Sequence, residues 1–191
     1  MKRNRNISRL KVPHNKHTAA MASVQIAPPA EVLLPMQMHS GQAAVPVVNV
    51  GDPVRIGQLI AREEGPISSP VYATISGTVS AIEPYEAGGR KTQAIRIAGD
   101  GKMEKDPAIA APQVSNLDEF LAAVQKSGIV GLGGAAFPLW KKLDAVRKNK
   151  IKTVLVNGAE CEPYITSDTR TMLEHSDMIV KGVSLLRKYL Q

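Results

Sequence analysis

The strongest constraint in this sequence is a change of pattern near residue 100. From residue 30 to about residue 99, short apolar runs alternate with turn signals rich in glycine, proline and serine. The clearest of these signals are Gly51-Asp52-Pro53, Gly65-Pro66, Ser76-Gly77 and Gly88-Gly89. Many short strands separated by such turns are typical of a small β barrel or sandwich. Beyond residue 115 the apolar residues recur at helical spacing, so we expect an α+β chain whose β domain comes first.

The β region contains several candidate strands, each bounded by turn residues. They are Val32–Gln37, Val45–Val50, Gln58–Arg62, Val71–Thr74, Thr78–Ile82 and Ala94–Ala98. Three glycines, Gly51, Gly57 and Gly77, stand where tight turns need a positive φ angle. The pattern resembles the barrel-sandwich hybrid fold of biotinyl and lipoyl domains, in which a hairpin lysine carries the cofactor. No lysine lies between Lys16 and Lys91, so the sequence argues against a carrier function and favours a docking or scaffold role.

The second half of the chain predicts helices around one short strand. Apolar residues at helical spacing are Leu117, Phe120, Leu121 and Val124. Ser115 or Asn116 can cap that first helix, and Gly128 can end it. The later expected elements are a basic helix from near Pro138, a short buried strand over Thr153–Val156, and helix from about Asp168 to Tyr189 with a break near Ser176.

These patterns divide the chain into four segments. We expect a basic flexible segment over residues 1–29, a barrel-sandwich β domain over 30–99, a linker over 100–114, and the N-terminal part of an α/β domain over 115–191. The α/β domain is expected to be incomplete, because a parallel sheet needs several strands and only one clear strand is offered here.

Positive charge is concentrated in two places. The formal net charge is +7. Residues 1–16 hold six basic residues and no acidic one, and residues 141–152 hold six basic residues and Asp144. Such local patches favour an anionic ligand at one place and anionic lipid or a partner at the other. A solvated tail and a solvated helix face remain the alternatives.

Composition excludes several classes of function. Aromatic residues make up 4% of the chain, too few for a base-stacking platform, so no nucleic-acid partner is expected. The single cysteine, Cys161, excludes a disulfide framework and cannot by itself ligate an iron–sulfur cluster. The histidines lack metal-ligand spacing, so we assign no metal site and no catalytic side chain. No apolar run reaches the roughly 20 residues of a membrane-spanning helix.

A glycine-rich loop precedes the basic helix. Gly131, Gly133 and Gly134 lie within four positions, and Pro138 suits the first turn of the helix that follows. Bare backbone can approach a ligand closely, and the unpaired N–H groups of a helix start suit phosphate, to which Lys142 adds charge. The spacing matches neither a Walker loop nor the usual dinucleotide fingerprint, and an ordinary tight turn remains an alternative.

An acidic turn follows the expected strand. Ligands of α/β sheets lie beyond the carboxyl ends of strands, which is where Asn157, Glu160 and Glu162 stand. The carboxylates would repel phosphate, so they are better suited to accept hydrogen bonds from ring N–H or ribose hydroxyl groups. An exposed acidic turn without a ligand is the alternative. Cys161, flanked by the two glutamates, is a poor nucleophile because its thiolate is disfavoured.

These motifs together resemble a known family. GLGGAAFPLWKKL followed by VLVNGAECEPYITSDTR closely resembles RnfC, the C subunit of the Rnf electron-transport complex. LLPMQMHSGQAAVPVVNVGDPVRIGQLIA and SPVYATISGTVSAIE are similar to its N-terminal barrel, so the resemblance covers about residues 30–190 and indicates an N-terminal portion. The paired motifs also resemble the FMN- and NADH-binding subunit of respiratory complex I and a cobalamin reductase of propanediol-using bacteria.

The resemblance implies that the α/β part is an FMN-binding domain that exchanges hydride with NADH or NAD. Gly131, Gly133 and Gly134 are implied to wrap the FMN phosphate and the dinucleotide. Lys142 is implied to contact the flavin, and Phe137 to lie beside the nicotinamide nucleotide. The glycines near phosphate agree with what the loop's own chemistry predicts.

For the acidic turn, the resemblance implies that Asn157 contacts FMN and that Glu160 and Glu162 border the flavin ring and the NADH site. FMN supplies the hydride and one-electron chemistry, while the protein orients it and sets its potential. One departure concerns the glycine loop, where Ala136 stands in place of the family's usual glycine.

The implied function is that of an electron-transfer subunit of a membrane-associated, ion-translocating ferredoxin:NAD oxidoreductase. Its 4Fe-4S clusters are expected only in the full-length protein, so the fragment alone is not expected to be a competent enzyme. The implied partners are NADH and the other subunits of the complex, which would hold the chain peripherally at the cytoplasmic face of the bacterial inner membrane. The alternatives are a cobalamin reductase of a diol-utilisation pathway and a non-catalytic scaffold with a vestigial nucleotide pocket.

Overall fold

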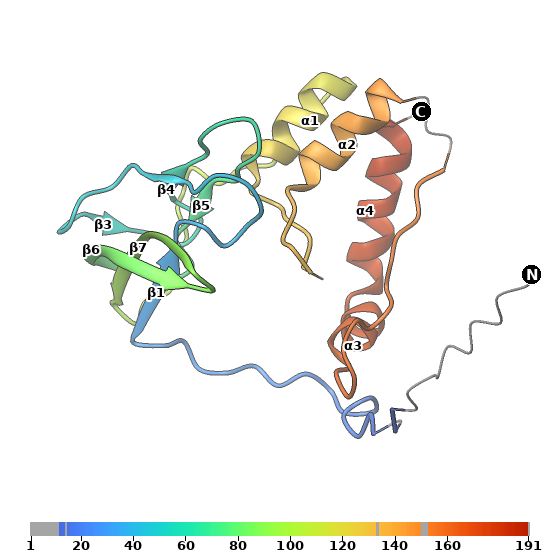
Figure 1. Cartoon of the computed structure of the whole chain (residues 1–191), viewed down its shortest axis with the longest axis horizontal. Coiled ribbons are helices and arrows are strands. Elements are labelled where there is room, and N and C mark those ends of the chain that lie inside the picture. Colours follow the sequence, from blue (N-terminus) through green and yellow to red (C-terminus); the bar gives the residue numbers. More distant parts are fainter. Residues whose placement is uncertain (1–11, 14, 133, 150–152, 191) are drawn as a thin grey trace, which may run out of the picture. The chain divides into compact units, whose positions relative to one another are not determined.

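A computed structural model describes residues 12–13, 15–132, 134–149 and 153–190. These residues form seven strands in two sheets and four helices (Figure 1). The chain divides into two compact units. One unit holds the described residues up to 25 together with residues 154–185, and the other holds the described residues of 26–153 and 186–190.

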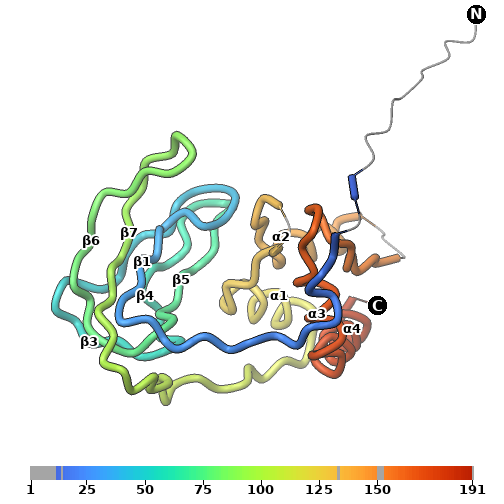
Figure 2. The backbone as a smooth tube through the Cα atoms, turned by 90° about the horizontal axis from the view of Figure 1, so that it is seen from below, coloured from blue at the N-terminus to red at the C-terminus, as the bar shows by residue number. Residues whose placement is uncertain are grey.

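Two antiparallel sheets form the β part of the chain. The larger sheet has the order β1 (Glu31–Pro35), β7 (Arg90–Gly99), β6 (Gly77–Ala87) and β3 (Pro53–Val54). The smaller sheet has the order β2 (Val45–Pro46), β4 (Leu59–Arg62) and β5 (Val71–Tyr72). β6 and β7 run side by side as a long hairpin (Figure 2), whose turn places two glycines at positive φ. The two antiparallel sheets agree with the sandwich-like β domain expected from the sequence.

The core lies between the two sheets. Side chains of β7 alternate between its faces, which places Ile95 and Ile97 on the buried face, where both are fully buried. They are joined by residues from both sheets and their connections. The other members are Leu34, Met36, Ala44, Val48, Val54, Ile60, Ala61, Val71, Ala73, Ile75 and Val79. This single apolar cluster holds the β domain together.

The positive φ angles expected at three glycines are confirmed. Gly51 has φ +97°, Gly57 has φ +82° and Gly77 has φ +159°. At Gly77 the chain also passes close to β7, because a Cβ there would stand 2.0 Å from the carbonyl oxygen of Ala98. Only glycine fits that position without displacing the neighbouring strand.

Several strands differ in length from the sequence-based expectation. The expected strand Val45–Val50 ends at Pro46, and β3 forms where only a turn was expected. The cause is a local turn, in which the N–H of Asn49 donates to the Asp52 carboxylate at 2.7 Å and redirects the chain. β6 and β7 extend well beyond their apolar stretches because each supplies the other's backbone partners.

The first helix, α1 (Leu117–Lys126), begins and ends where expected, and the second, α2 (Leu139–Lys148), begins where expected. The Asn116 side chain accepts a hydrogen bond from the N–H of Glu119 at 2.9 Å, which confirms the predicted cap. Gly128, at φ +69°, follows the end of α1. The two helices pack through a small apolar cluster, in which the Tyr189 ring stacks on Phe120 at 4.7 Å.

The predicted helix after residue 167 is confirmed as α3 (Ser167–Glu174) and α4 (Ser176–Tyr189), with the break at His175. The buried strand expected over Thr153–Val156 is wrong. These residues form no strand and are exposed, with Leu155 at 87%. A strand needs a neighbour for its N–H and C=O groups, and no described residue pairs with this run.

Within the N-terminal segment, the described residues from 15 to 23 lie against α3 and the turn before it (Figure 2). The Lys16 ammonium donates to the carbonyl of Ile165 at 2.7 Å, and the N–H of Ser23 donates to the Glu174 carboxylate at 2.9 Å. Charge and backbone bonds, rather than apolar burial, attach this segment. Across the described residues, no helix has both the length and the apolar character needed to cross a bilayer.

Candidate functional site

Two backbone hydrogen bonds join the ends of the glycine loop just before α2, and we call this pair of bonds the neck of the loop. The N–H of Gly131 donates to the carbonyl of Phe137 at 3.0 Å. The N–H of Leu139 donates to the carbonyl of Ile129 at 2.9 Å. Phe137 is half-buried. These two bonds define residues 131–137 as a loop whose ends are fixed.

Within the loop, part of the main chain is exposed to solvent. A Cβ on Gly134, which has φ +92°, would meet no atom within 4 Å. Leu132 is 98% exposed, and Gly133 lies outside the described residues. Ala136 adopts φ +48°, a left-handed conformation that normally favours glycine. A ligand could therefore approach the main chain at Gly134 closely.

The Lys142 ammonium lies over the loop. A Cβ built on Gly131 would stand 3.1 Å from its Nζ atom. Among the described residues, no carboxylate comes within ion-pair distance of Lys142. Its positive charge is therefore available to an anion beside open backbone, which is the donor set that a phosphate requires.

At the C-terminal end of α2, by contrast, the basic side chains are paired with carboxylates. Asp144 accepts hydrogen bonds from Arg147 and Lys148, each at 2.6 Å, and Arg147 also pairs with Asp118 at 2.6 Å. The bond from Lys148, with help from Arg147, holds the pKa of Asp144 below its usual value. In the basic patch predicted over residues 141–152, the described basic residues that have no carboxylate partner therefore lie at the end of α2 next to the glycine loop.

In the first turn of α2, Trp140 carries a polar atom without a partner among the described residues. Its indole Nε1 is buried and makes no hydrogen bond within the described residues. The Lys141 ammonium stands 4.9 Å from the centre of the same ring. The indole N–H is an additional donor near the start of α2, which the sequence did not single out.

In the other unit, the acidic turn is shaped by its own side chains. The Asn157 side-chain oxygen accepts from the N–H of Ala159 at 3.0 Å. Gly158 packs against α3, where a Cβ would stand 2.7 Å from the Met172 sulfur. Glu162 is exposed. The free amide of Asn157 and the Glu162 carboxylate remain open to a ligand.

The two carboxylate oxygens of Glu160 have different surroundings. One of its oxygens, Oε1, accepts from the N–H of Thr169 at 2.9 Å and so caps the first turn of α3. That bond lowers the pKa of the Glu160 carboxyl. The other oxygen, Oε2, is buried and has no partner among the described residues. A buried acceptor without a donor is costly, which marks Oε2 as a candidate for a ligand donor.

A hollow of about 240 Å³ lies beside this turn. It is lined by Val12, Pro13, Lys16, Glu160, Cys161, Glu162, Pro163 and Tyr164. Lys16 comes from the N-terminal segment, and its charge further lowers the pKa of Glu160. The hollow therefore combines carboxylates with one ammonium group.

The structure brings the predicted residues together in two sets. Gly131, Gly134, Phe137 and Lys142 gather in the unit that contains the β domain. Asn157, Glu160 and Glu162 gather in the unit that contains α3. Among the described residues, no group of three or more histidine, cysteine or acidic side chains could hold a metal ion.

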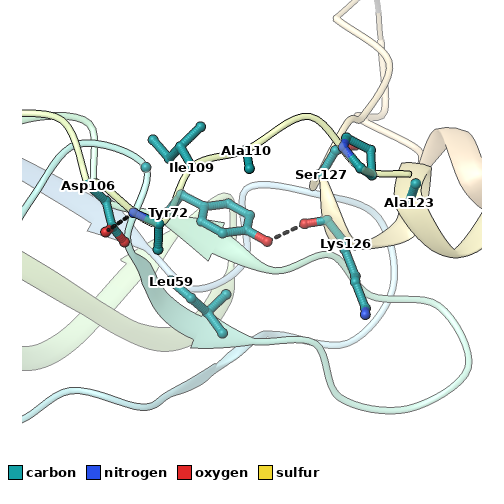
Figure 3. A pocket seen from close by; sticks show the side chains of 11 residues that line it. Leu59, Tyr72, Asp106, Ile109, Ala110, Ala123, Lys126 and Ser127 are labelled. Carbon is teal, nitrogen blue, oxygen red and sulfur yellow. Dashed lines mark hydrogen bonds between the residues drawn. The ribbon is translucent and has the colours of Figure 1, made fainter. Parts of the chain in front are cut away.

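A larger hollow of about 690 Å³ lies between the smaller sheet, residues 106–112 and the end of α1 (Figure 3). Leu59 and Ile109 give it an apolar lining, and the hydroxyl of Tyr72 donates to the carbonyl of Lys126 at one side of it. No sequence pattern indicated this hollow, because its walls come from segments far apart in the chain.

Comparison with family models matches both halves of the chain. Residues 8–102 match the RnfC barrel sandwich hybrid domain. Residues 124–191 match the Nuo51 FMN-binding domain. The first match covers the two sheets, and the second covers the glycine loop and the acidic turn.

Curated relatives are similar over most of this chain. It is 41% identical over 181 residues to the C subunit of the proton-translocating ferredoxin:NAD(+) oxidoreductase complex of Clostridium ljungdahlii, covering 92% of this chain and 40% of the relative. It is 37% identical over 182 residues to the C subunit of the ion-translocating oxidoreductase complex of Rhodobacter capsulatus, covering 92% and 35%. It is 36% identical over 181 residues to the C subunit of the Na(+)-translocating ferredoxin:NAD(+) oxidoreductase complex of Acetobacterium woodii, covering 92% and 41%. The chain thus spans well under half the length of these relatives.

Proposed function

The chain belongs to the RnfC family, and from this premise we propose that it forms the FMN- and NADH-binding part of an ion-translocating ferredoxin:NAD oxidoreductase. The observation that carries the proposal is the uncompensated Lys142 ammonium beside the backbone of Gly131, in a loop with open main chain at Gly134. This arrangement fits an anionic group, and FMN ends in a phosphate.

In this proposal the glycine loop binds the FMN phosphate. Gly131, Gly133 and Gly134 let the backbone approach it, and Lys142 neutralises its charge. Phe137 lies beside the nicotinamide nucleotide, where its half-buried ring limits access of water. The loop does no covalent chemistry. Its residues bind and orient.

The acidic turn accepts hydrogen bonds from the nucleotides. Asn157 offers its amide N–H groups to FMN, because its side-chain oxygen is already bonded to Ala159. Oε2 of Glu160 and the carboxylate of Glu162 accept from ring N–H or ribose hydroxyl groups. When bound, FMN supplies hydride and one-electron transfer, and these residues set its orientation and surroundings.

The activity and partners of the whole protein extend this proposal. In the full-length protein, 4Fe-4S clusters held by parts of the family that this chain does not match would supply the onward electron transfer; this chain covers 40% of the Clostridium ljungdahlii relative. The other members of the complex hold the protein at the cytoplasmic face of the bacterial inner membrane.

Flavin titration tests the proposal directly. FMN added to the purified chain should lose fluorescence on binding, and NADH added without oxygen should bleach the bound flavin's absorbance. Riboflavin, which lacks the phosphate, should bind at least ~10-fold more weakly, because a charge-assisted contact is lost. Absence of FMN binding by both the chain and the full-length protein contradicts the proposal.

One observation favours a second candidate, a scaffold whose nucleotide pocket has lost its function. The expected site oxygens of Asn157 and Glu160 are partly used for internal bonds, to Ala159 and Thr169. A full-length protein that joins the complex but neither binds FMN nor oxidises NADH would support this candidate. Nothing in the described residues favours the cobalamin-reducing relative.

A further inference from the structure

The β domain bonds directly to the glycine loop through one residue. Ser40, which follows β1, donates from its hydroxyl to the carbonyl of Ala135 at 2.5 Å. The N–H of Ser40 also donates to the carbonyl of Ala136 at 3.2 Å. Two consecutive carbonyls of the loop are thus held by one residue about 95 positions earlier in the chain.

Two further hydroxyl groups of the β domain hold the segment just before the loop. Ser69 donates to the carbonyl of Gly128 at 3.2 Å, and the Tyr72 hydroxyl donates to the carbonyl of Lys126 (Figure 3). The last carbonyls of a helix have no partner within it, so the Tyr72 hydroxyl completes the end of α1, while Ser69 fixes the residue just beyond it. The packing is close, because a Cβ on Gly128 would stand 3.0 Å from the Pro70 carbonyl oxygen.

Ser40 itself sits in a turn that is firmly held. Its neighbour His39 is buried, and the His39 Nε2 atom accepts from the N–H of Ser69 at 3.0 Å. The N–H of Gln42 donates to the carbonyl of Ile67 at 2.8 Å. A Cβ on Gly41 would stand 2.0 Å from that same carbonyl oxygen. The turn therefore offers Ser40 as a fixed pair of donors.

The loop needs such support. Ala136 has φ +48°, a conformation that is unfavourable for alanine and persists only where the surroundings hold it. The bonds from Ser40 fall on the carbonyls of Ala135 and Ala136, directly at the strained residue. They hold the peptide groups between Gly134 and the neck of the loop.

We propose that Ser40 is a positioning residue for FMN, which holds the phosphate-binding loop in its open conformation from the β domain. The inference rests on the proposed FMN site and deepens it. It gives this barrel-sandwich domain, which has no lysine between Lys16 and Lys91 to carry a cofactor, a role in shaping the neighbouring site. Preorganised loops bind more tightly because less ordering is required on binding.

The test compares Ser40→Ala with a matched variant, Ser80→Ala, which removes a hydroxyl bond to the carbonyl of Arg96 elsewhere on the β domain. Ser40→Ala should raise the Kd for FMN about tenfold, since one hydrogen bond and the loop's order are lost. Ser40→Thr keeps the hydroxyl and should restore binding, and Ser80→Ala should leave the Kd unchanged. Ser40→Cys, a weaker donor of similar size, should lie between.

A second readout needs no cofactor. In Ser40→Ala the hydrogen-bonded amides at the base of the loop, those of Gly131 and Leu139, should exchange with solvent faster, while those of Val79 and Ile97 in the core stay protected. If wild-type protein fails to bind FMN, the proposed function fails. Faster amide exchange in Ser40→Ala would still support the inference that Ser40 holds the loop in position. Unchanged loop exchange, or wild-type FMN affinity in Ser40→Ala, overturns it. If the core amides of Ser40→Ala also exchange faster, the variant is generally destabilised and Ser40→Cys replaces it in the test. A wild-type Kd for FMN in Ser40→Cys then overturns the positioning role.

Discussion

The Lys142 ammonium stands 3.1 Å from the point where a side chain on Gly131 would begin. The missing side chain leaves the amine directly beside main chain, and no described carboxylate competes for it. Arg147 and Lys148, on the same helix, are both paired with Asp144. Lys142 is therefore the charge of α2 that a phosphate would meet, which leads to the first prediction.

Lys142→Gln should weaken FMN binding by about 10- to 100-fold, the loss expected for a hydrogen bond to a charged group. Riboflavin binding should change little, because riboflavin has no phosphate. Lys91→Gln, at the exposed end of the β6–β7 hairpin, makes the same change of charge and serves as the control. Fluorescence titration with both flavins measures the effect. An equal loss for riboflavin would show that Lys142 does not act on the phosphate.

Ala136→Gly should stabilise the chain by up to about 1 kcal/mol. Alanine at φ +48° is strained, and glycine relieves that strain while losing more entropy on folding. Ala135→Gly is the matched control, because Ala135 has no positive φ to relieve, and it should destabilise by about 0.5–1 kcal/mol. Urea unfolding of the three proteins gives the comparison. Equal changes in both variants would contradict strain at Ala136.

The attachment of the N-terminal segment should depend on pH. Arg170, with the N–H of Ser23, lowers the pKa of Glu174 from 4.5 to about 2. Because the folded pKa lies below the unfolded one, this bond stabilises fully above pH 4.5 and is lost as pH falls toward 2. Glu174→Gln should therefore be less stable than wild type at neutral pH and similar near pH 2.

The free energy of unfolding, followed from neutral pH to acid, measures this difference. Glu86→Gln, in the exposed part of the β6–β7 hairpin, is the control and should track wild type throughout. A gap between Glu174→Gln and wild type that stays constant down to pH 2 would mean that Glu174 is not ionised against Arg170.

Asn116→Ala should destabilise the chain by about 1 kcal/mol, because the N–H of Glu119 loses its acceptor at the start of α1. Asn116→Asp keeps an acceptor and should stay close to wild type, since aspartate is an equally good cap. Thermal unfolding followed by circular dichroism distinguishes the two. A stable Asn116→Ala would mean that packing of Phe120 and Leu121 alone holds the helix.

Local chemistry made several features predictable. The cap at Asn116, the glycine after α1 and the positive φ angle of Gly51 depend on residues within a few positions. Apolar runs bounded by turns likewise indicated the two-sheet β domain, and the paired glycine and acidic motifs indicated the family. The site residues were also named from the sequence, but their roles stay predictions.

Other features were decided only by contacts between distant segments. The expected strand Thr153–Val156 has apolar residues but no described neighbour to bond to, so it stays exposed. Glu160 caps α3 with one oxygen and leaves the other unpartnered, which the motif alone did not reveal. Ser40 gave no signal in the sequence, because its role depends on carbonyls about 95 residues away. Short-range pattern determines which conformations each segment prefers, whereas long-range hydrogen bonding decides which of them are kept and which side chains face a site.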